Sequence, residues 1–350
     1  MTPARLAVEL KERGRAEGFD RVRVAAAREL ERDRATLDRW LGAGHHAGMS
    51  WIERTADRRA DPRRVLPGCR SVVSLAWNHG PGRAGPADGR APVARYARGR
   101  DYHRVLGTRL GRLAAWVAAT SGQPARAFVD SGPVLERAWA EASGLGWIGK
   151  NACVITRDLG SWILLGEILS VAEIEPDLGP HPDLCGTCTA CLDACPTGAI
   201  LEAGVVDSNR CISYWTIEHR GAVPAERRSG NADWIFGCDV CQEVCPWNRR
   251  FAREPERTPD PAPDLDGLDP IDILGMDERT FRGRYSGTAL LRARWDGMRR
   301  NACIVLGNRG DRAALAALAV AREDEDPVVR SHAAWAIERI ERIEPRAGKG

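Results

Sequence analysis

A run of four cysteines constrains this chain of 350 residues more than any other feature. Residues 185–196 read Cys-Gly-Thr-Cys-Thr-Ala-Cys-Leu-Asp-Ala-Cys-Pro, which is the spacing C-x2-C-x2-C-x3-C-P. In bacterial ferredoxins the first three thiolates of this run bind one 4Fe–4S cluster, and the fourth binds a second cluster. The run therefore predicts a further group of cysteines elsewhere in the chain.

A shorter run at residues 238–246, C-x2-C-x3-C-P, supplies this group but has one cysteine fewer. Cys211 lies between the two runs and can provide the missing thiolate. The simplest closure gives each cluster the four thiolates that it requires. One predicted set is Cys185, Cys188, Cys191 and Cys245, and the other is Cys195, Cys211, Cys238 and Cys241.

Two other uses of closely spaced cysteines fit this sequence less well. Zinc ribbons also use C-x2-C pairs, but they seldom carry C-x3-C-P in both runs. Disulfide frameworks are typical of small secreted domains, whereas this chain is long and most of its cysteines lie in one segment. The N-terminus lacks the apolar region of a signal peptide, and no apolar run approaches the ~20 residues of a membrane span. We therefore expect a cytoplasmic protein without a membrane partner.

The length of the chain indicates two or three domains, because one hydrophobic core seldom supports so many residues. Strands and helices alternate between residues 20 and 175, so we expect an α/β domain at 1–175. The cysteine runs predict a bacterial ferredoxin-like domain with two clusters at 176–255. The Asp-Pro-Val-Val-Arg segment at residue 326 and the alanine-rich helix after it are typical of stacked HEAT-like repeats. We expect a C-terminal α-helical domain of such repeats at 256–350.

Asp130 is a candidate for chemistry because it follows an apolar strand and precedes a predicted helix. Carboxylates at such positions often take part in catalysis. Aspartate is also a good helix cap, and without further evidence capping is the more frequent role. The segment Asp101-x-His103 is similar to the D-x-H-x-x-G motif of proteins that bind cobalamin through histidine. Gly107 comes one residue too late for this motif, and we reject it.

Taken together, several segments closely resemble the epoxyqueuosine reductase family, whose members act in tRNA modification. The resemblance covers nearly the whole chain. Its most specific segments are Tyr-Ala-Arg-Gly-Arg-Asp-Tyr-His at 96–103, Val-Asp-Ser at 129–131, Gly-Leu-Gly-Trp-Ile-Gly-Lys at 144–150, Arg-Cys-Ile-Ser-Tyr-Trp-Thr-Ile at 210–217, Gly-Cys-Asp-Val-Cys at 237–241 and Arg-Asn-Ala at 300–302. The chain departs from some relatives at Ala94, where they have a cysteine, and this excludes a thiol role there.

The resemblance implies both the cofactors and the reaction. The N-terminal α/β domain would bind cobalamin without a histidine ligand, and the two 4Fe–4S clusters would pass electrons one at a time to its cobalt. Epoxyqueuosine at the wobble position of tRNA would be reduced to queuosine. The sequence has no evident flavin or nicotinamide motif, so we expect an external electron donor such as a ferredoxin or flavodoxin. We expect the enzyme to be a monomer.

The resemblance also implies roles for single residues. Asp130 matches the proton donor of the family and lies in the cofactor site. Because the oxygen removed from the epoxide must be protonated, we expect burial to raise the pKa of this carboxyl. Arg59 matches an arginine that contacts the corrinoid. Val154 and Leu165 match positions that line its site, and Ser213 matches such a position less closely.

Two alternatives stay open, and the second belongs to another functional class. The first is a corrinoid iron–sulfur reductase that acts on a different substrate, such as an organohalide. The second is a non-enzymatic scaffold in which the clusters only stabilise the fold and the helical repeats bind a partner. Binding of tRNA distinguishes the first alternative, and replacement of Asp130 by asparagine distinguishes the second.

Overall fold

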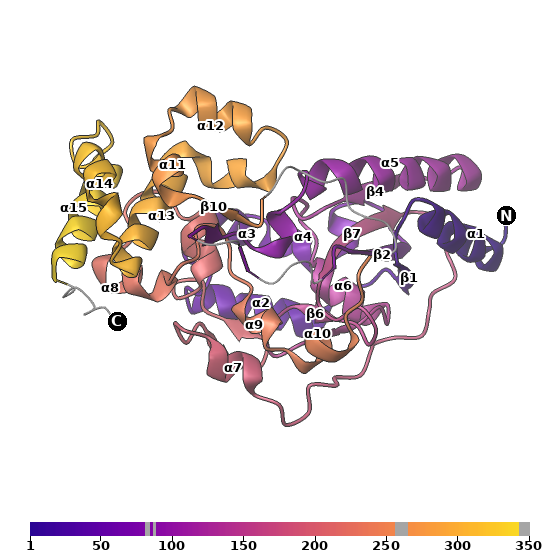
Figure 1. Cartoon of the computed structure of the whole chain (residues 1–350). Coiled ribbons are helices and arrows are strands. Elements are labelled where there is room, and N and C mark those ends of the chain that lie inside the picture. Colours follow the sequence, from indigo (N-terminus) through magenta and orange to yellow (C-terminus); the bar gives the residue numbers. More distant parts are fainter. Residues whose placement is uncertain (81–84, 87–88, 256–264, 343–350) are drawn as a thin grey trace. The chain divides into compact units, whose positions relative to one another are not determined.

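The computed structural model describes residues 1–80, 85–86, 89–255 and 265–342. The chain forms two compact units, and each unit contains segments that are distant in the sequence (Figure 1). The first unit comprises Met1–Gly82, Arg100–Ser208 and Val240–Pro261, and the second comprises Arg83–Gly99, Asn209–Asp239 and Ala262–Gly350. The predicted domain boundary at residue 256 lies outside the described residues. No helix in the described part of the chain is long and apolar enough to cross a bilayer.

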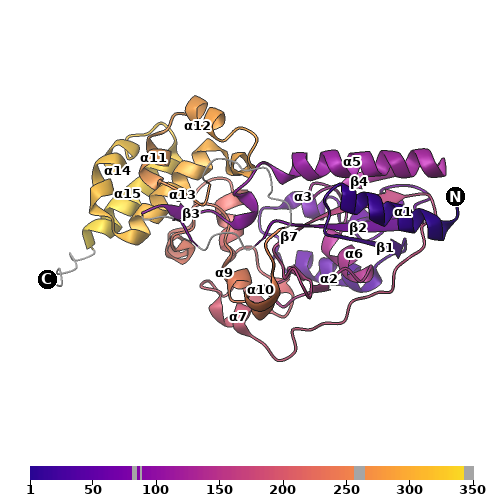
Figure 2. The ribbon, with the colours of Figure 1, turned by 45° about the vertical axis from the view of Figure 1, so that its right-hand side comes forward.

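An antiparallel sheet of four strands, in the order β1–β2–β7–β4, forms the centre of the first unit (Figure 2). The strands are β1 (Arg21–Ala26), β2 (Ser71–Asn78), β4 (Ala125–Phe128) and β7 (Ile163–Ser170). Strand β2 is buried along its whole length. In the β2–β7 register, Ser74 lies opposite Glu167, so these two polar side chains lie on the same face of the sheet.

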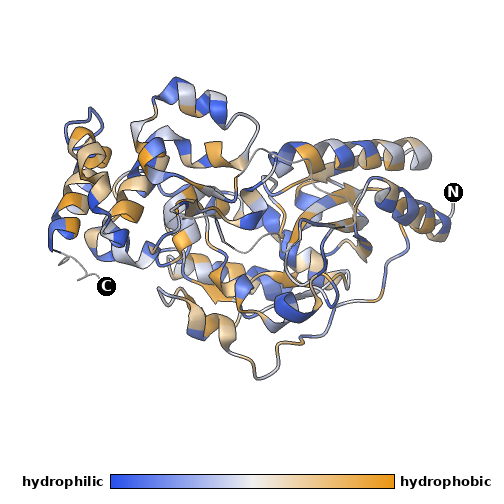
Figure 3. Ribbon diagram, in the orientation of Figure 1, coloured by the Kyte–Doolittle hydropathy of each residue, from blue (hydrophilic) through white to orange (hydrophobic). Residues whose placement is uncertain are grey.

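Helices cover both faces of this sheet. Helices α1 (Pro3–Ala16) and α5 (Tyr102–Ser121) pack on one face around a shared apolar core. Figure 3 shows apolar and polar residues alternating along α5, as expected for a helix with one buried side. A Cβ atom on Gly166 would lie 2.3 Å from Leu110 Cδ1, so glycine permits the close approach of α5 to β7. Helix α6 (Glu136–Ala142) packs on the other face.

Short elements carry the remaining segments of the first unit. The N-terminal ones are α2 (Glu31–Gly42), α3 (Ser50–Glu53), α4 (Ala56–Arg59) and η1 (Pro62–Arg64). Two small hairpins are β5 (Trp147–Ile148) with β6 (Val154–Ile155), and β8 (Ile200–Glu202) with β9 (Val205–Val206). The cysteine runs are accompanied by α7 (Ala190–Ala194), α9 (Val240–Glu243) and α10 (Pro246–Phe251).

The second unit is mainly helical, and its helices beyond residue 264 agree with the α-helical domain expected at the C-terminus. Its helices are α8 (Ala225–Arg228), α11 (Pro270–Gly275), α12 (Glu278–Arg284), α13 (Arg294–Arg309), α14 (Leu315–Ala321) and α15 (Pro327–Arg342). Its shorter elements are β3 (Ala91–Pro92), η2 (Arg95–Ala97), η3 (Tyr214–Glu218), η4 (Ser229–Asn231), β10 (Gly267–Leu268), η5 (Ala289–Ala293) and η6 (Arg312–Ala314). Helix α13 is buried along most of its length and packs closely on α15. A Cβ atom on Gly307 would lie 2.7 Å from Trp335 Cζ3, which explains the glycine at this contact.

Candidate active site and cluster ligands

Asp130 lies in the loop between β4 and α6, and its backbone has a φ of +54°. This left-handed region is sparsely populated by residues that have a Cβ atom, and aspartate is among those that tolerate it best. The Asp130 side chain is 61% exposed. The expectation that the protein buries this carboxyl is therefore wrong, and the loop presents the carboxylate at the surface of the first unit.

His103 links Asp130 to a second carboxylate. His103 Nε2 lies 3.1 Å from Asp130 Oδ2, and His103 Nδ1 lies 2.7 Å from Asp101 Oδ1. Asp101 also caps α5, because its side chain accepts a hydrogen bond from the backbone N–H of His103 at 3.1 Å. The hydrogen bonds with Asp101 and then with Asp130 raise the pKa of His103 to about 9. At neutral pH the ring is therefore an imidazolium that donates to both carboxylates.

Glu136, the first residue of α6, holds the backbone of the Asp130 loop. The Asp130 N–H donates a hydrogen bond of 2.5 Å to Glu136 Oε1. Burial of Glu136, with the charge of Asp130 adding to it, raises the pKa of this carboxyl to about 7. Sequence analysis missed Glu136, because a glutamate in the first turn of a helix is common and usually has only a local role.

Glu167 lies behind Glu136, on the central strand β7, and is fully buried. No N–H or O–H donor in the described part of the chain reaches either of its carboxylate oxygens. The neighbouring titratable group is the Glu136 carboxyl, and two carboxyls close together in a buried site resist carrying a charge at the same time. Burial, and then the neighbouring Glu136 charge, raises the pKa of Glu167 well above its ordinary value. A series of carboxyls thus leads from the interior of the sheet to Asp130.

Arg59, which was predicted to contact the cofactor, belongs to the same surroundings. It ends α4, and its backbone carbonyl accepts a hydrogen bond of 3.2 Å from the N–H of Leu135. Burial lowers the pKa of Arg59, while the charges of Glu136 and Asp130 oppose this effect. The structure therefore brings Arg59 and Asp130 together in one electrostatic environment.

The other predicted cofactor residues lie in two places. Val154 and Leu165 belong to one apolar cluster of the first unit, whose buried members include Ala76 and Leu145. Ser213 belongs to the second unit, where it directly precedes η3.

The first predicted cysteine set lies wholly within the first unit. Its members are Cys185, Cys188, Cys191 and Cys245. Burial, with the charges of the Cys185 and Cys245 thiolates adding to it, raises the pKa of Cys191 to about 11. These thiols therefore lie close enough to repel one another as thiolates, and a bound cation would stabilise them.

Two tryptophan rings and one lysine lie beside this cysteine set. Trp147 is fully buried, its Nε1–H lies 3.4 Å from Cys185 Sγ, and its ring meets that of Trp247 edge-on with centroids 4.9 Å apart. Lys150 Nζ donates hydrogen bonds to the carbonyls of Gly186 and Cys188 at 2.7 and 2.9 Å. These contacts give the Gly-rich segment at 144–150 a structural role beside the cysteine run.

The second predicted set is divided between the two units. Cys195 and Cys241 belong to the first unit, and Cys211 and Cys238 belong to the second. Burial acts against ionisation of Cys195, but hydrogen bonds from the backbone N–H groups that follow it lower its pKa. One of these donors is the N–H of Ala199, which lies 3.3 Å from Cys195 Sγ.

Over the residues that the structure describes, no three His, Cys, Asp or Glu side chains are arranged around a single metal ion. A four-iron cluster is larger than one ion, so the sulfur atoms of its ligands stand further apart than those of a tetrahedral zinc site.

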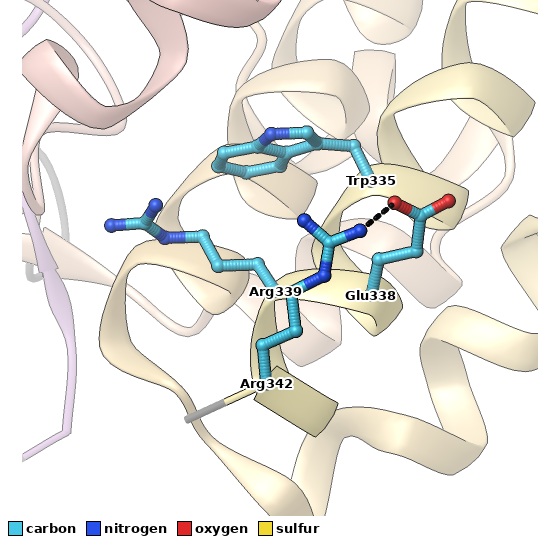
Figure 4. A pocket seen from close by; sticks show the side chains of 4 residues that line it. All are labelled: Trp335, Glu338, Arg339 and Arg342. Carbon is cyan, nitrogen blue, oxygen red and sulfur yellow. Dashed lines mark hydrogen bonds and ion pairs between the residues drawn. The ribbon is translucent and has the colours of Figure 1, made fainter. Parts of the chain in front are cut away.

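A pocket of about 250 Å³ lies on α15 in the second unit. It is lined by Trp335, Glu338, Arg339 and Arg342 (Figure 4). The Arg339 guanidinium lies 5.5 Å from the centroid of the Trp335 ring, and Arg342 pairs with Glu338 at 3.4 Å. The pocket combines an aromatic face with two cations, which is the chemistry of many nucleic-acid contacts.

Three family models match separate stretches of the chain. The model described as a 4Fe-4S double cluster binding domain matches residues 184–248. The model described as epoxyqueuosine reductase QueG, DUF1730, matches residues 59–131, and the model for HEAT repeats matches residues 288–348. The predictions of a two-cluster segment and of C-terminal HEAT-like repeats are thereby confirmed.

Relatives match nearly the whole chain. The epoxyqueuosine reductase of Gloeobacter violaceus is 44% identical over 314 residues, which cover 87% of this chain and 97% of the relative. The enzyme of Pseudomonas aeruginosa is 42% identical over 346 residues, or 96% of this chain and 95% of the relative. A crystal structure of epoxyqueuosine reductase with an epoxyqueuosine-modified tRNA-Tyr stem loop matches with a TM-score of 0.91 at 30% identity, covering 97% of this chain and 91% of that chain. The chain belongs to the epoxyqueuosine reductase family.

Proposed function

We propose that this chain reduces epoxyqueuosine to queuosine at the wobble position of tRNA. The observation that carries the proposal is the exposed carboxylate of Asp130, hydrogen-bonded to a charged His103. An exposed acid supplied with a proton by its neighbour is what removal of an oxygen atom from a large substrate requires. The modified stem loop in the similar crystal structure supports the same substrate.

The reaction breaks the two carbon–oxygen bonds of the epoxide and forms a carbon–carbon double bond. It consumes one electron pair and two protons, and the oxygen leaves as water. In the proposed mechanism the proton on His103 passes to Asp130 through the Nε2–Oδ2 hydrogen bond, and Asp130 delivers it to this oxygen as it leaves. The imidazole then takes up the second proton from solvent and passes it on by the same route. Asp101 keeps the imidazole charged and oriented from the other side.

The contacts of His103 support a corrinoid that takes no ligand from this histidine. Both ring nitrogens of His103 are engaged by carboxylates, so this histidine is not free to bind cobalt. Leu165 and Ile163 on β7 are only partly buried and supply an apolar surface beside Val154. Arg59, Val154, Leu165 and, from the second unit, Ser213 are the residues that would contact the ring. Cobalamin, when bound, would supply the electrons that reduce the substrate carbon.

The two 4Fe–4S clusters are proposed to take their ligands as the cysteine spacing predicts. One set is Cys185, Cys188, Cys191 and Cys245, and the other is Cys195, Cys211, Cys238 and Cys241. The proximity of the Cys185, Cys191 and Cys245 thiols supports the first set. The requirement of four thiolates for each such cluster supports the second set.

The electrons are proposed to come from a separate ferredoxin or flavodoxin, because the sequence shows no flavin or nicotinamide motif. The enzyme is proposed to work as a monomer in the cytoplasm. None of the eleven cysteines forms a disulfide, which suits a reducing compartment.

The content of iron and cobalt tests this proposal. The protein would be purified without oxygen and incubated with cobalamin, and both metals would be measured per chain. We expect about eight irons and one cobalt, together with conversion of epoxyqueuosine-containing tRNA when a chemical reductant is added. Full iron without cobalt would contradict the proposed chemistry, and full loading without conversion would contradict the substrate.

A further inference from the structure

We propose that Arg300 and Asn301 are positioning residues for an iron–sulfur cluster. This inference rests on the proposed function, because it takes Cys211 and Cys238 as ligands of that cluster. The pair lies on α13, and each residue is 1% exposed. The proposed reaction gives neither residue a role. All of the residues that carry the argument lie in the second unit.

Arg300 uses all five N–H donors of its guanidinium. Nη1 donates to the carbonyls of His219 and Gly221 at 3.0 and 2.9 Å. Nη2 donates to the carbonyl of Trp215 at 2.7 Å. The two remaining bonds, from Nε and Nη2, reach Asn301 Oδ1 at 3.1 and 2.9 Å. A charge this deeply buried is costly unless its hydrogen bonds are satisfied. Here every N–H donor binds a carbonyl of the segment that follows Cys211 or the neighbouring Asn301.

Asn301 connects the two segments that carry the cysteines. Its Nδ2 donates to the carbonyls of Thr216 and Ile235, each at 2.9 Å. Thr216 follows Cys211, and Ile235 precedes Cys238 in its segment. With both donors used and Oδ1 accepting two bonds from Arg300, the amide is fully satisfied, and another side chain would leave buried carbonyls unpaired.

A hydroxyl forms a second bridge between the same segments. Thr216 is fully buried, and its Oγ1 donates to the carbonyl of Ile212 at 2.8 Å while it accepts from the N–H of Gly237 at 2.9 Å. Ile212 is the neighbour of Cys211, and Gly237 is the neighbour of Cys238. The backbones beside the two cysteines are therefore held together through one side chain.

The backbone conformation of η3 makes the Trp215 carbonyl available to Arg300. This element (Tyr214–Glu218) is a π-helix, and the N–H of His219 donates to the carbonyl of Tyr214 at 2.9 Å. In an α-helix the same N–H would take the carbonyl of Trp215. The wider turn leaves this carbonyl free for Arg300, and such turns are frequent at functional sites.

The inference is that the first long helix of the repeat region fixes the spacing of two cluster thiolates. Arg300→Met and Asn301→Leu remove the hydrogen bonds at nearly constant volume. Arg299→Met is the matched control on the same helix, because Arg299 is 6% exposed and donates to the Leu274 carbonyl and to Asp324. Neither of these partners belongs to a cysteine segment.

The readouts are iron per chain after anaerobic reconstitution, the electron paramagnetic resonance spectrum of the reduced protein, and the thermal unfolding midpoint. We expect about four irons and loss of one cluster signal in Arg300→Met and Asn301→Leu. The control should keep about eight irons, even though its midpoint falls.

Retention of both clusters in the two variants would overturn the inference, as would loss of the same cluster in the control. Loss of both clusters would also overturn it, because the cysteines of the first set lie in the other unit. The iron count requires neither tRNA nor cobalamin, so it is independent of whether the chain acts on epoxyqueuosine.

Discussion

The backbone N–H of Asp130 donates a hydrogen bond of 2.5 Å to Glu136 Oε1. This bond attaches the loop of the proposed proton donor to a carboxyl whose charge helps to raise the pKa of the buried Glu167. The Glu136 side chain therefore links the position of Asp130 to the ionisation of Glu167.

Replacing Glu136 by alanine should disturb the loop, because the left-handed backbone of Asp130 loses its acceptor. We expect turnover to fall about 10- to 100-fold, in line with the cost of misplacing a catalytic group. Glu136→Gln keeps an acceptor oxygen and should lose less than tenfold. Single-turnover conversion of modified tRNA measures both. Equal rates in the alanine variant and the parent protein would contradict the role of this bond.

The buried carboxyl pair should make stability depend on pH. The pKa of Glu136 is raised to about 7 in the folded chain, whereas an unfolded glutamate titrates near its ordinary value of about 4.3. The folded state therefore holds more protons between these values, so its stability falls as the pH rises from the lower value to about 7.

Glu167→Gln supplies a neutral side chain of the same shape and should remove part of this pH dependence. We expect the variant to gain on the order of 1–3 kcal/mol relative to the parent chain between pH 5 and pH 8. Thermal unfolding followed by circular dichroism at both pH values provides the comparison. A parent chain that is equally stable at both pH values would contradict the raised pKa of the pair.

The charged His103 should set the alkaline limit of activity. Its pKa is raised to about 9 by Asp101 and Asp130, so the ring is protonated below that pH and loses its proton above it. We expect the rate to decline about tenfold per pH unit beyond this point. His103→Gln should lower the rate about 100-fold and abolish the decline. Asp101→Asn should move this decline to lower pH. If the dependence of the rate on pH is the same in Asp101→Asn as in the parent enzyme, the imidazole does not supply the proton.

The pocket on α15 offers a test of tRNA contact. If Arg339 and Arg342 meet phosphates, Arg339→Gln/Arg342→Gln should weaken binding and reduce the slope of log affinity against log salt by about 1 to 2. Arg282→Gln/Arg284→Gln on α12 removes the same charge outside the pocket and serves as the control. Filter binding across salt concentrations measures the slope. Equal slopes in the two double variants would exclude a specific contact in this pocket.

Features that depend on local spacing could be predicted from the sequence. The cysteine runs indicate their clusters because the ligands follow one another within a few residues. The alternation of strands and helices between residues 20 and 175 follows from their apolar patterns, and the helical end follows from its repeat pattern. The antiparallel order of the sheet was not predicted, since the pairing of β2 with β7 joins segments far apart in the chain.

The proton-handling groups depend on long-range contacts and were missed for that reason. Glu167 interrupts an otherwise apolar strand, which was an available indication, but its partner on α6 could not be identified from spacing. His103 lies 27 residues from Asp130 in the sequence, and the rejected cobalamin motif had left it without a role. The predicted burial of Asp130 was wrong because the strained loop turns this carboxyl outward.

Conversion of epoxyqueuosine to queuosine by Asp130→Asn, compared with the parent enzyme, tests the central claim most directly. Both proteins would be loaded with iron and cobalamin, reduced chemically, and mixed with modified tRNA whose nucleosides are then analysed by mass spectrometry. We predict queuosine from the parent enzyme and at least about a 100-fold loss in the variant, with equal metal content. Equal conversion by the two proteins, or no conversion by a fully loaded parent enzyme, would contradict the account.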